Sequence, residues 1–446
     1  MVGREEVLRA AKTALAACRA DQAEVVMMLQ DSYLTRFAEN HIHQNVGERN
    51  VTVNVRAVVG KKIGVALTND LSDEALRRTS ERASEIARLQ REDPRFVSLP
   101  GPEPVPSLPA EITAVHEYSP EERAERVARV IAAAKKAGVR AAGSLSTGGL
   151  GLAVVNSLGV EAYSSATTVG FTTVVMSDTS SGYADWAGRD LQALDVDAQT
   201  RVAVRKCVDS RAPKSIEPGE YEVILEAPAV ADMLSTLGFL GLSALAVQEG
   251  RSFMNGHFGE KVVGETIDLW DDGLDPTGIP IPFDFEGVPK RRVELITGGV
   301  AKGVVWDSYT ANLEAGKRST GHALPAPNVY GPLPMNLFLG AGTASAEDLV
   351  ASTKRGILVT RFHYTNPIHP TKTIFTGMTR DGTFLVENGR VTAALKNLRF
   401  TEAITRALGN VDLIGRERRL QAGFFGGSVV PALKVKSFNF TGVTEF

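Results

Sequence analysis

A proline-rich stretch near residue 100 constrains the fold of this chain more than any other feature of its sequence. Between residues 93 and 118 stand six prolines: Pro94, Pro100, Pro102, Pro104, Pro106 and Pro109. Because proline has no backbone N–H and a fixed φ, this density predicts a stiff, extended linker. Pro213 and Pro218 mark a second break. A chain of 446 residues is too long for one ordinary core. The predicted domains cover residues 1–100, 112–212 and 218–446.

The two N-terminal segments each predict helices packed on an antiparallel sheet. Residues 51–58 alternate apolar and polar side chains, as a half-buried strand does. Ser72-Asp73-Glu74 is typical of a helix start, and so is Ser119-Pro120-Glu121-Glu122, with its serine cap and proline at the first helical position. Residues 148–152 are rich in glycine and lack a phosphate-binding pattern, so they predict a turn between strands.

The C-terminal segment predicts mostly strands. Asp381-Gly382 and Asn388-Gly389 are typical of hairpin turns. The apolar residues 227–247 are interrupted by Asp232 and by several breakers, so they predict a buried helix over 228–247 instead of a membrane span. The predicted fold class is α+β, in which a β-rich, barrel-like or multi-sheet C-terminal domain encloses this helix.

Charge and cysteine content exclude several classes of protein. The formal net charge of -3 gives no basic face for nucleic acid or for an anionic membrane surface. Cys18 and Cys207 are the only cysteines, and they predict small core side chains in a reducing compartment. The acidic N-terminal residues do not resemble a signal peptide, so we expect a cytoplasmic protein.

The residues that could carry chemistry do not form a recognisable catalytic set. None of the seven histidines has the H-E-x-x-H spacing of a zinc helix, and no G-x-S-x-G nucleophile elbow occurs. His41 and His43 point to one side of a predicted strand and could chelate, but no motif nearby completes the set. The sequence therefore predicts no catalytic residue and no metal ligand in this chain.

Two segments remain as candidates for a peptide groove or an interface. His363 and His369 flank a segment with two prolines nearby, which predicts an irregular surface loop that could line a groove. The alternative is an ordinary surface loop that binds nothing. Glu286 precedes the basic trio Lys290-Arg291-Arg292 and could help Arg291 clamp a peptide terminus, although a surface ion-pair cluster explains the same pattern. His322 is a further candidate groove residue.

Several short segments, in order along the chain, resemble the TldD/PmbA family and specifically its PmbA (TldE) branch. They are Ala38-Glu39-Asn40 and residues 51–58, 60–64, 221–225, 285–289, 295–303, 336–339 and 384–389. The resemblance implies a cytoplasmic peptidase built from two homologous subunits. The TldD-like subunit carries H-E-x-x-x-H on the helix after the strand that here is residues 221–225, and a later metal-binding cysteine.

This chain departs from that pattern at each essential point. The corresponding helix, residues 231–242, has neither histidine nor glutamate, and residues 420–427 contain no cysteine. Leucine and phenylalanine cannot bind zinc. The resemblance therefore implies a metal-free, non-catalytic subunit that completes a chamber around the zinc of a TldD-like partner and helps it to cleave small or unfolded peptides.

Two alternatives stay open from the sequence alone. One is a self-associating, homodimeric peptide-binding or scaffold protein that has no protease partner. The other is a self-sufficient hydrolase with an atypical site near His322, His363 and His369.

Overall fold

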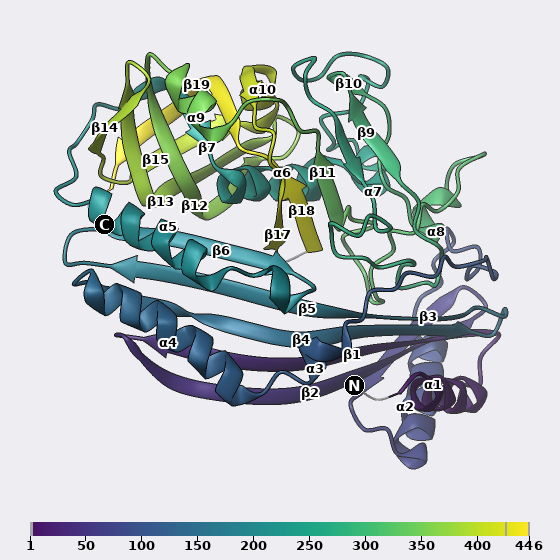
Figure 1. Ribbon diagram of the computed structural model, residues 1–446. Helices are drawn as coiled ribbons and strands as arrows, with labels where there is room; N and C mark the ends of the chain where they lie inside the picture. The colour runs from purple at the N-terminus through teal and green to yellow at the C-terminus, as the bar shows by residue number, and fades with distance from the viewer. Residues whose placement is uncertain (1–2, 424–425, 445–446) are drawn as a thin grey trace.

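One antiparallel sheet extends through the N-terminal half of the protein in this computed structural model, which describes residues 3–423 and 426–444. Its strand order is β3-β2-β1-β4-β5-β6 (Figure 1). The strands are β1 (Gln22–Ala38), β2 (His41–Val59), β3 (Lys62–Thr68), β4 (Arg140–Asn156), β5 (Glu161–Met176) and β6 (Ser181–Gly188). The sequence predicts a separate sheet for each N-terminal segment. The structure instead joins them, because β1 and β4 pair edge to edge in the middle of the sheet.

Strand β4 of this sheet runs through a glycine-rich segment that would ordinarily suggest a turn. The predicted turn at residues 148–152 is wrong, since β4 continues through it without a break. A Cβ atom on Gly148 would lie 2.1 Å from the backbone oxygen of Asp31 on β1. Glycine is therefore present here because two strand backbones approach closely, and not because the chain turns.

Helices cover one face of this sheet. They are α1 (Arg4–Ala17), α2 (Asp73–Leu89), α4 (Pro120–Lys136) and α5 (Val196–Asp209), with the short α3 (Thr113–His116) and η1 (Leu191–Ala193). α4 begins as the sequence predicts, with a capping box between Ser119 and Glu122. On the opposite face, Val26 and Val154 pack against Phe283 of the C-terminal half, which lies above the sheet in Figure 1. The sheet is thus the layer between its helices and the C-terminal half.

Five strands of the C-terminal half form a closed ring. Their order is β12-β7-β19-β15-β13, and β12 also pairs with β13. The strands are β7 (Gly219–Leu225), β12 (Arg355–His369), β13 (Ile374–Glu387), β15 (Leu398–Ala403) and β19 (Leu433–Val443), with β14 (Arg390–Ala394) and β16 (Val411–Ile414) attached. Phe362, Phe400 and Phe438 pack in its core.

The two predicted hairpin turns in this ring have different outcomes. Asn388-Gly389 does connect β13 to β14, with positive φ at both residues. Asp381-Gly382 also has positive φ, but it lies inside β13 at an irregularity in the pairing with β12. The same dipeptide chemistry serves a strand bulge there, so the prediction of a turn is wrong.

A second sheet, β10-β9-β8-β11-β18-β17, lies beside the ring, and the apolar helix packs between them. Its strands are β8 (Leu269–Asp271), β9 (Val293–Thr297), β10 (Val300–Ala301), β11 (Asn336–Leu339), β17 (Arg419–Gly423) and β18 (Gly426–Val430). The helices are α6 (Ala227–Gly241), α7 (Ala244–Gln248), α8 (Ser308–Ala311), α9 (Ala346–Ala351) and α10 (Ile404–Gly409). The α+β class and the β-rich C-terminal half with a buried helix are confirmed.

The predicted helix over 228–247 is divided in the structure. α6 ends at Gly241, and Ser243 caps α7 by accepting a hydrogen bond from the amide of Ala246 at 3.2 Å. None of the helices in residues 3–423 and 426–444 has both the length and the apolarity that crossing a membrane requires.

Candidate functional site

A cavity of about 320 Å³ lies where α6 faces the hairpin of β17 and β18. α6 lines it with Asp232, Ser235 and Phe239, and the hairpin side contributes residues 421–423 and 426–428. Phe424 and Phe425, in the segment where the resemblance implies a metal-binding cysteine, lie outside the described residues. The fold therefore brings together the two segments in which the resemblance implies metal ligands for a TldD-like subunit.

The sequence of α6 determines which of its side chains reach this cavity. Pro228 stands in the first turn, where its missing N–H costs nothing. Asp232, Ser235 and Phe239 follow at intervals of three and four and so share one face. The remaining faces are apolar and packed: Leu234 and Leu237 are fully buried, and Leu240 is 3% exposed.

Asp232 is the acidic group that α6 offers to the cavity. The hydroxyl of Thr365 on β12 donates to its two carboxylate oxygens, at 2.9 and 3.0 Å. Burial raises the pKa of Asp232 above its ordinary value. Its carboxyl group is thus held in place by a neutral donor, while the charge of Arg361 opposes the upward shift of its pKa.

The opposite wall belongs to the N-terminal sheet and to β12. Arg361 stacks over the ring of Tyr183 at 4.6 Å, and its Nε donates to Asp381 at 2.7 Å. Burial raises the pKa of Asp185 above its ordinary value, although Arg419 lies 3.7 Å away and opposes that shift. The cavity therefore combines two half-buried carboxyls, a fixed arginine and an aromatic ring.

These residues do not fit a catalytic zinc ion. Zinc in peptidases takes imidazole, thiolate or carboxylate ligands, three of them from the protein. Among residues 3–423 and 426–444, no three His, Cys, Asp or Glu side chains gather closely enough to hold a metal. Asp232 is committed to Thr365, and the buried positions of α6 are aliphatic. The arrangement can bind polar groups, but it has neither a metal-ligand set nor a general base beside one.

His322, predicted to line a groove, is instead a core residue. Its side chain is 0% exposed. Its Nε2 lies 2.7 Å from Asp271 Oδ1, and its Nδ1 lies 2.9 Å from the hydroxyl of Thr320. Burial lowers the pKa of His322, which favours the neutral ring with one donor and one acceptor. Since substrate cannot reach it, that prediction is wrong.

The other four candidate histidines lie on strands. His363 and His369 belong to β12, so the irregular loop predicted around them is wrong. A bulge in the pairing of β12 with β13 lies beside Pro367, and Pro370 follows the end of the strand. His363 is half-buried and His369 is exposed. His41 and His43 on β2 have ring centroids 6.3 Å apart. The groove or interface role of His363 and His369 stays a prediction.

Glu286 does not join the basic trio that follows it. Arg291 pairs with Glu103 at 2.7 Å, and Arg292 pairs with Glu294 at 2.7 Å. Glu286 is 6% exposed and turns toward Arg56 of β2. The predicted peptide clamp between Glu286 and Arg291 is therefore wrong, because the two side chains serve different contacts.

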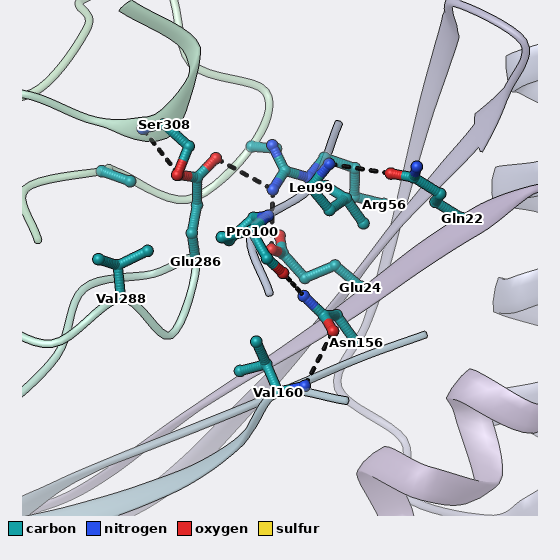
Figure 2. A network of polar contacts seen from close by, with 12 residues as sticks. Gln22, Glu24, Arg56, Leu99, Pro100, Asn156, Val160, Glu286, Val288 and Ser308 are labelled. Carbon is teal, nitrogen blue, oxygen red and sulfur yellow. Dashed lines mark hydrogen bonds and ion pairs between the residues drawn. The ribbon is translucent and has the colours of Figure 1, made fainter. Parts of the chain in front are cut away.

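Arg56 joins the N-terminal sheet to the C-terminal half. Figure 2 shows its guanidinium group between Glu24 of β1 and Glu286. Its Nη2 lies 2.8 Å from the carboxylate of Glu24 and 3.2 Å from that of Glu286. The second oxygen of Glu286 accepts a hydrogen bond from the amide of Ser308 at 3.2 Å. This contact was not predicted from the sequence. The only indication in the sequence is that Glu24 and Arg56 are charged residues within two neighbouring, largely apolar strand segments.

The proline-rich linker is fixed against the same sheet. The amide of Leu99 donates to Gln22 at 2.9 Å, and Asn156 donates to the backbone oxygen of Pro100 at 2.8 Å (Figure 2). The first part of the linker thus lies against the sheet beside the Arg56 contact.

The protonation of Glu24 gives stability a specific pH dependence. Burial raises the pKa of Glu24 to about 7, and repulsion from Glu286 adds to the shift while Arg56 opposes it. A glutamate in the unfolded chain has a pKa of about 4.3. Between about pH 4.3 and pH 7, the folded protein therefore keeps a proton on Glu24 that the unfolded chain has lost. This contribution to stability is complete below about pH 4 and disappears as the pH rises through about 7.

We expect Glu24→Gln to abolish this dependence. Between pH 5 and pH 8, the unfolding free energy of the native protein should fall relative to that of Glu24→Gln by on the order of 2 kcal/mol. Urea unfolding at four pH values measures the difference. Glu81→Gln, at an exposed position on α2, is the control and should follow the native protein. Parallel curves for the native protein and Glu24→Gln would show that Glu24 stays ionised throughout.

Comparison with known proteins identifies the family. The family profile described as PmbA/TldA metallopeptidase C-terminal domain matches residues 218–442, half of the chain. The chain belongs to the TldD/PmbA family. A second profile of this family, for PmbA/TldA metallopeptidase domain 1, matches residues 23–87. The resemblance stated from the sequence is confirmed.

Individual members of the TldD/PmbA family align with part or all of the chain. A metalloprotease TldD homolog from Haemophilus influenzae is 25% identical over 224 residues, which are 50% of this chain and 46% of that protein. A metalloprotease from Archaeoglobus fulgidus is 26% identical over 234 residues, 51% of this chain and 52% of its own length. The chain thus spans about half the length of these curated relatives.

The whole fold is similar to a solved member. The crystal structure of TldE from Thermococcus kodakarensis superposes with a TM-score of 0.87 and 23% sequence identity, covering 98% of this chain and 99% of that one. At this identity the likeness establishes the fold.

Proposed function

We propose that this chain is the non-catalytic, metal-free subunit of a two-component TldD/PmbA peptidase. The observation that carries the proposal is the face that α6 presents to its cavity: Asp232, Ser235 and Phe239 occupy the helix on which a TldD-like subunit would hold its metal. Family membership supports a metallopeptidase assembly, and the donor set of this chain supports a role that leaves hydrolysis to the partner.

The likeness to TldE supports the pairing with a TldD-like subunit. In this proposal the partner carries H-E-x-x-x-H and the zinc ion. This chain completes the chamber around that site, in which small or unfolded peptides are cleaved.

An open strand edge supports the handling of extended peptides or of a partner strand. β2 pairs with β3 only from Val53 onward. Among the described residues, strand partners for residues 41–52 of β2 come from β1 alone, and these residues are largely exposed. An unpaired edge of this length is a template to which another strand can add.

Co-expression tests the pairing. The tagged chain is produced together with a family member that carries H-E-x-x-x-H. The purified material is separated by size-exclusion chromatography, and its molar mass is measured by light scattering. We expect the two proteins to elute together in equal amounts. Elution of this chain without the co-expressed protein, at the mass it has alone, would contradict the proposal.

The alternatives make different predictions for the same preparations. A homodimeric scaffold would have twice the 47.7 kDa of one chain and would not exchange subunits with the metallopeptidase. A self-sufficient hydrolase near His322 is disfavoured, because that side chain is buried and bonded on both nitrogens.

A further inference from the structure

A second cavity, of about 710 Å³, lies between the N-terminal sheet and the C-terminal half. It is more than twice the size of the cavity beside α6, about 320 Å³. Its volume falls within the range of sites for small organic molecules. It shares no lining residue with the α6 cavity, so an inference drawn from it is independent of the proposed function.

Apolar residues form about half of the lining of this cavity. Ile63, Phe96 and Leu245 line it. Val97 and Val329, also lining residues, are 63% and 81% exposed. Apolar side chains left in water around a concave surface mark a place where an apolar body can bind.

The floor carries a carboxylate with spare hydrogen-bonding capacity. Asp307 is 5% exposed and lines the cavity. Its Oδ1 caps α8 by accepting from the amide and the hydroxyl of Thr310, at 2.8 and 2.6 Å. Among the described residues, none donates a hydrogen bond to its Oδ2. A carboxylate oxygen without a donor in the wall of a cavity can accept a hydrogen bond from a ligand that brings a donor.

Neighbouring charges make the floor attractive to a cation. Arg56, which also lines the cavity, is shared between Glu24 and Glu286, so it neutralises only one of them. Burial raises the pKa of Asp307 to about 6, and repulsion from Glu286 adds to the shift. Arg56 opposes the shift, but when Glu24, Glu286 and Asp307 are ionised their three negative charges exceed its single positive charge, which disfavours an anionic ligand and favours a positive one.

The charges at the mouth are already paired. Asp93 accepts a hydrogen bond from Tyr309 at 2.7 Å and lies 3.7 Å from Arg95. Glu249 pairs with Arg251. The charges of Asp93 and Arg95 offset each other, and so do those of Glu249 and Arg251. The carboxylate of Asp307 is then the group for which a ligand would have to supply a positive charge.

We propose that this cavity binds a small apolar molecule that carries an ammonium group, with the carboxylate of Asp307 receiving the ammonium and the apolar walls receiving the rest. A free amine and the amino terminus of an apolar peptide share this chemistry. The ammonium supplies the donors that Oδ2 lacks and adds the positive charge that the floor lacks.

Titration calorimetry of the full chain at pH 7.5 tests the proposal with two matched probes, 2-phenylethylamine and 2-phenylethanol. We expect the amine to bind at least tenfold more tightly than the alcohol. Phe-Leu-amide and its N-acetylated form then separate the two sources of ammonium. Tighter binding of the free dipeptide than of the amine, lost on acetylation, would assign the site to peptide amino termini; the reverse would assign it to small amines.

Two variants locate the binding. Asp307→Asn keeps the Oδ1 cap of α8 and removes the charge, so amine affinity should fall at least tenfold. Asp195→Asn is its control, because Asp195 caps α5 in the same way with a 2.9 Å bond from Ala198. Val329→Lys repels an ammonium from an exposed position where folding is not at stake, and Val391→Lys, at a 47% exposed valine, is its control.

Three results would overturn the proposal. They are equal affinities for the amine and the alcohol, no measurable binding of either ammonium probe to the native chain, or native amine affinity in both Asp307→Asn and Val329→Lys. Since Val329→Lys changes a surface side chain, a folding defect in Asp307→Asn would still leave the site testable.

Discussion

Replacing Arg56 with methionine is expected to destabilise the protein by about 3–5 kcal/mol at pH 7. Methionine fills similar space but leaves Glu24 and Glu286, which are 1% and 6% exposed, buried without their shared cation. Either the carboxyls take up protons or the interface between the N-terminal sheet and the C-terminal half opens. Urea unfolding followed by circular dichroism measures the loss.

Two further proteins separate the charge effect from a general effect of the substitution. Arg49→Met removes an arginine from the same strand, where its side chain is 73% exposed and lies 3.8 Å from Asp31; it should cost much less than Arg56→Met, because solvent screens this pair. Arg56→Met combined with Glu24→Gln should recover much of the loss, because one buried charge disappears with the other. A loss for Arg56→Met no larger than that for Arg49→Met would show that the contact does not hold the two halves together.

The second large effect concerns α6. Leu240→Asp should cost about 3–5 kcal/mol, because Leu240 is 3% exposed in an apolar core and an aspartate there would be a buried, unpaired charge. The expected result is a chain that unfolds at a much lower urea concentration, or that does not accumulate as folded protein.

Leu89→Asp is the matched control for this change. Leu89 ends α2 and is 87% exposed, so its replacement should leave the unfolding midpoint nearly unchanged. Equal midpoints for Leu240→Asp and the native chain would mean that α6 is not part of the core, and the position assigned to it beside the cavity would fail.

Local signals in the sequence predicted local structure well. The serine cap at Ser119 and the alternation over residues 51–58 each determine a few neighbouring residues, and the structure has a helix and a strand there. Asp381-Gly382 shows the limit, since positive φ suits a turn and a bulge equally, and pairing with β12 decides between them. Gly148 shows the same limit, because its neighbour Asp31 is distant in the sequence.

The candidate site depended even more on long-range contacts. The apolar character of α6 was evident from composition alone, and its burial is confirmed. That Glu286 pairs with Arg56 could not be predicted, because the two residues lie 230 positions apart. The nearest cations in the sequence, at residues 290–292, are not its partners, since Arg291 and Arg292 pair with Glu103 and Glu294 instead. His322 was misassigned for the same reason: its partner Asp271 is 51 residues away.

Zinc content and peptide cleavage, measured together on the separate and combined subunits, test the central claim most directly. This chain and an H-E-x-x-x-H family member are purified apart, dialysed against zinc, and assayed on an unfolded peptide before and after mixing. The account predicts that this chain alone holds no stoichiometric zinc and cleaves nothing, and that mixing produces or strongly increases cleavage. One tightly held zinc ion per copy of this chain, with cleavage in the absence of any partner, would contradict it.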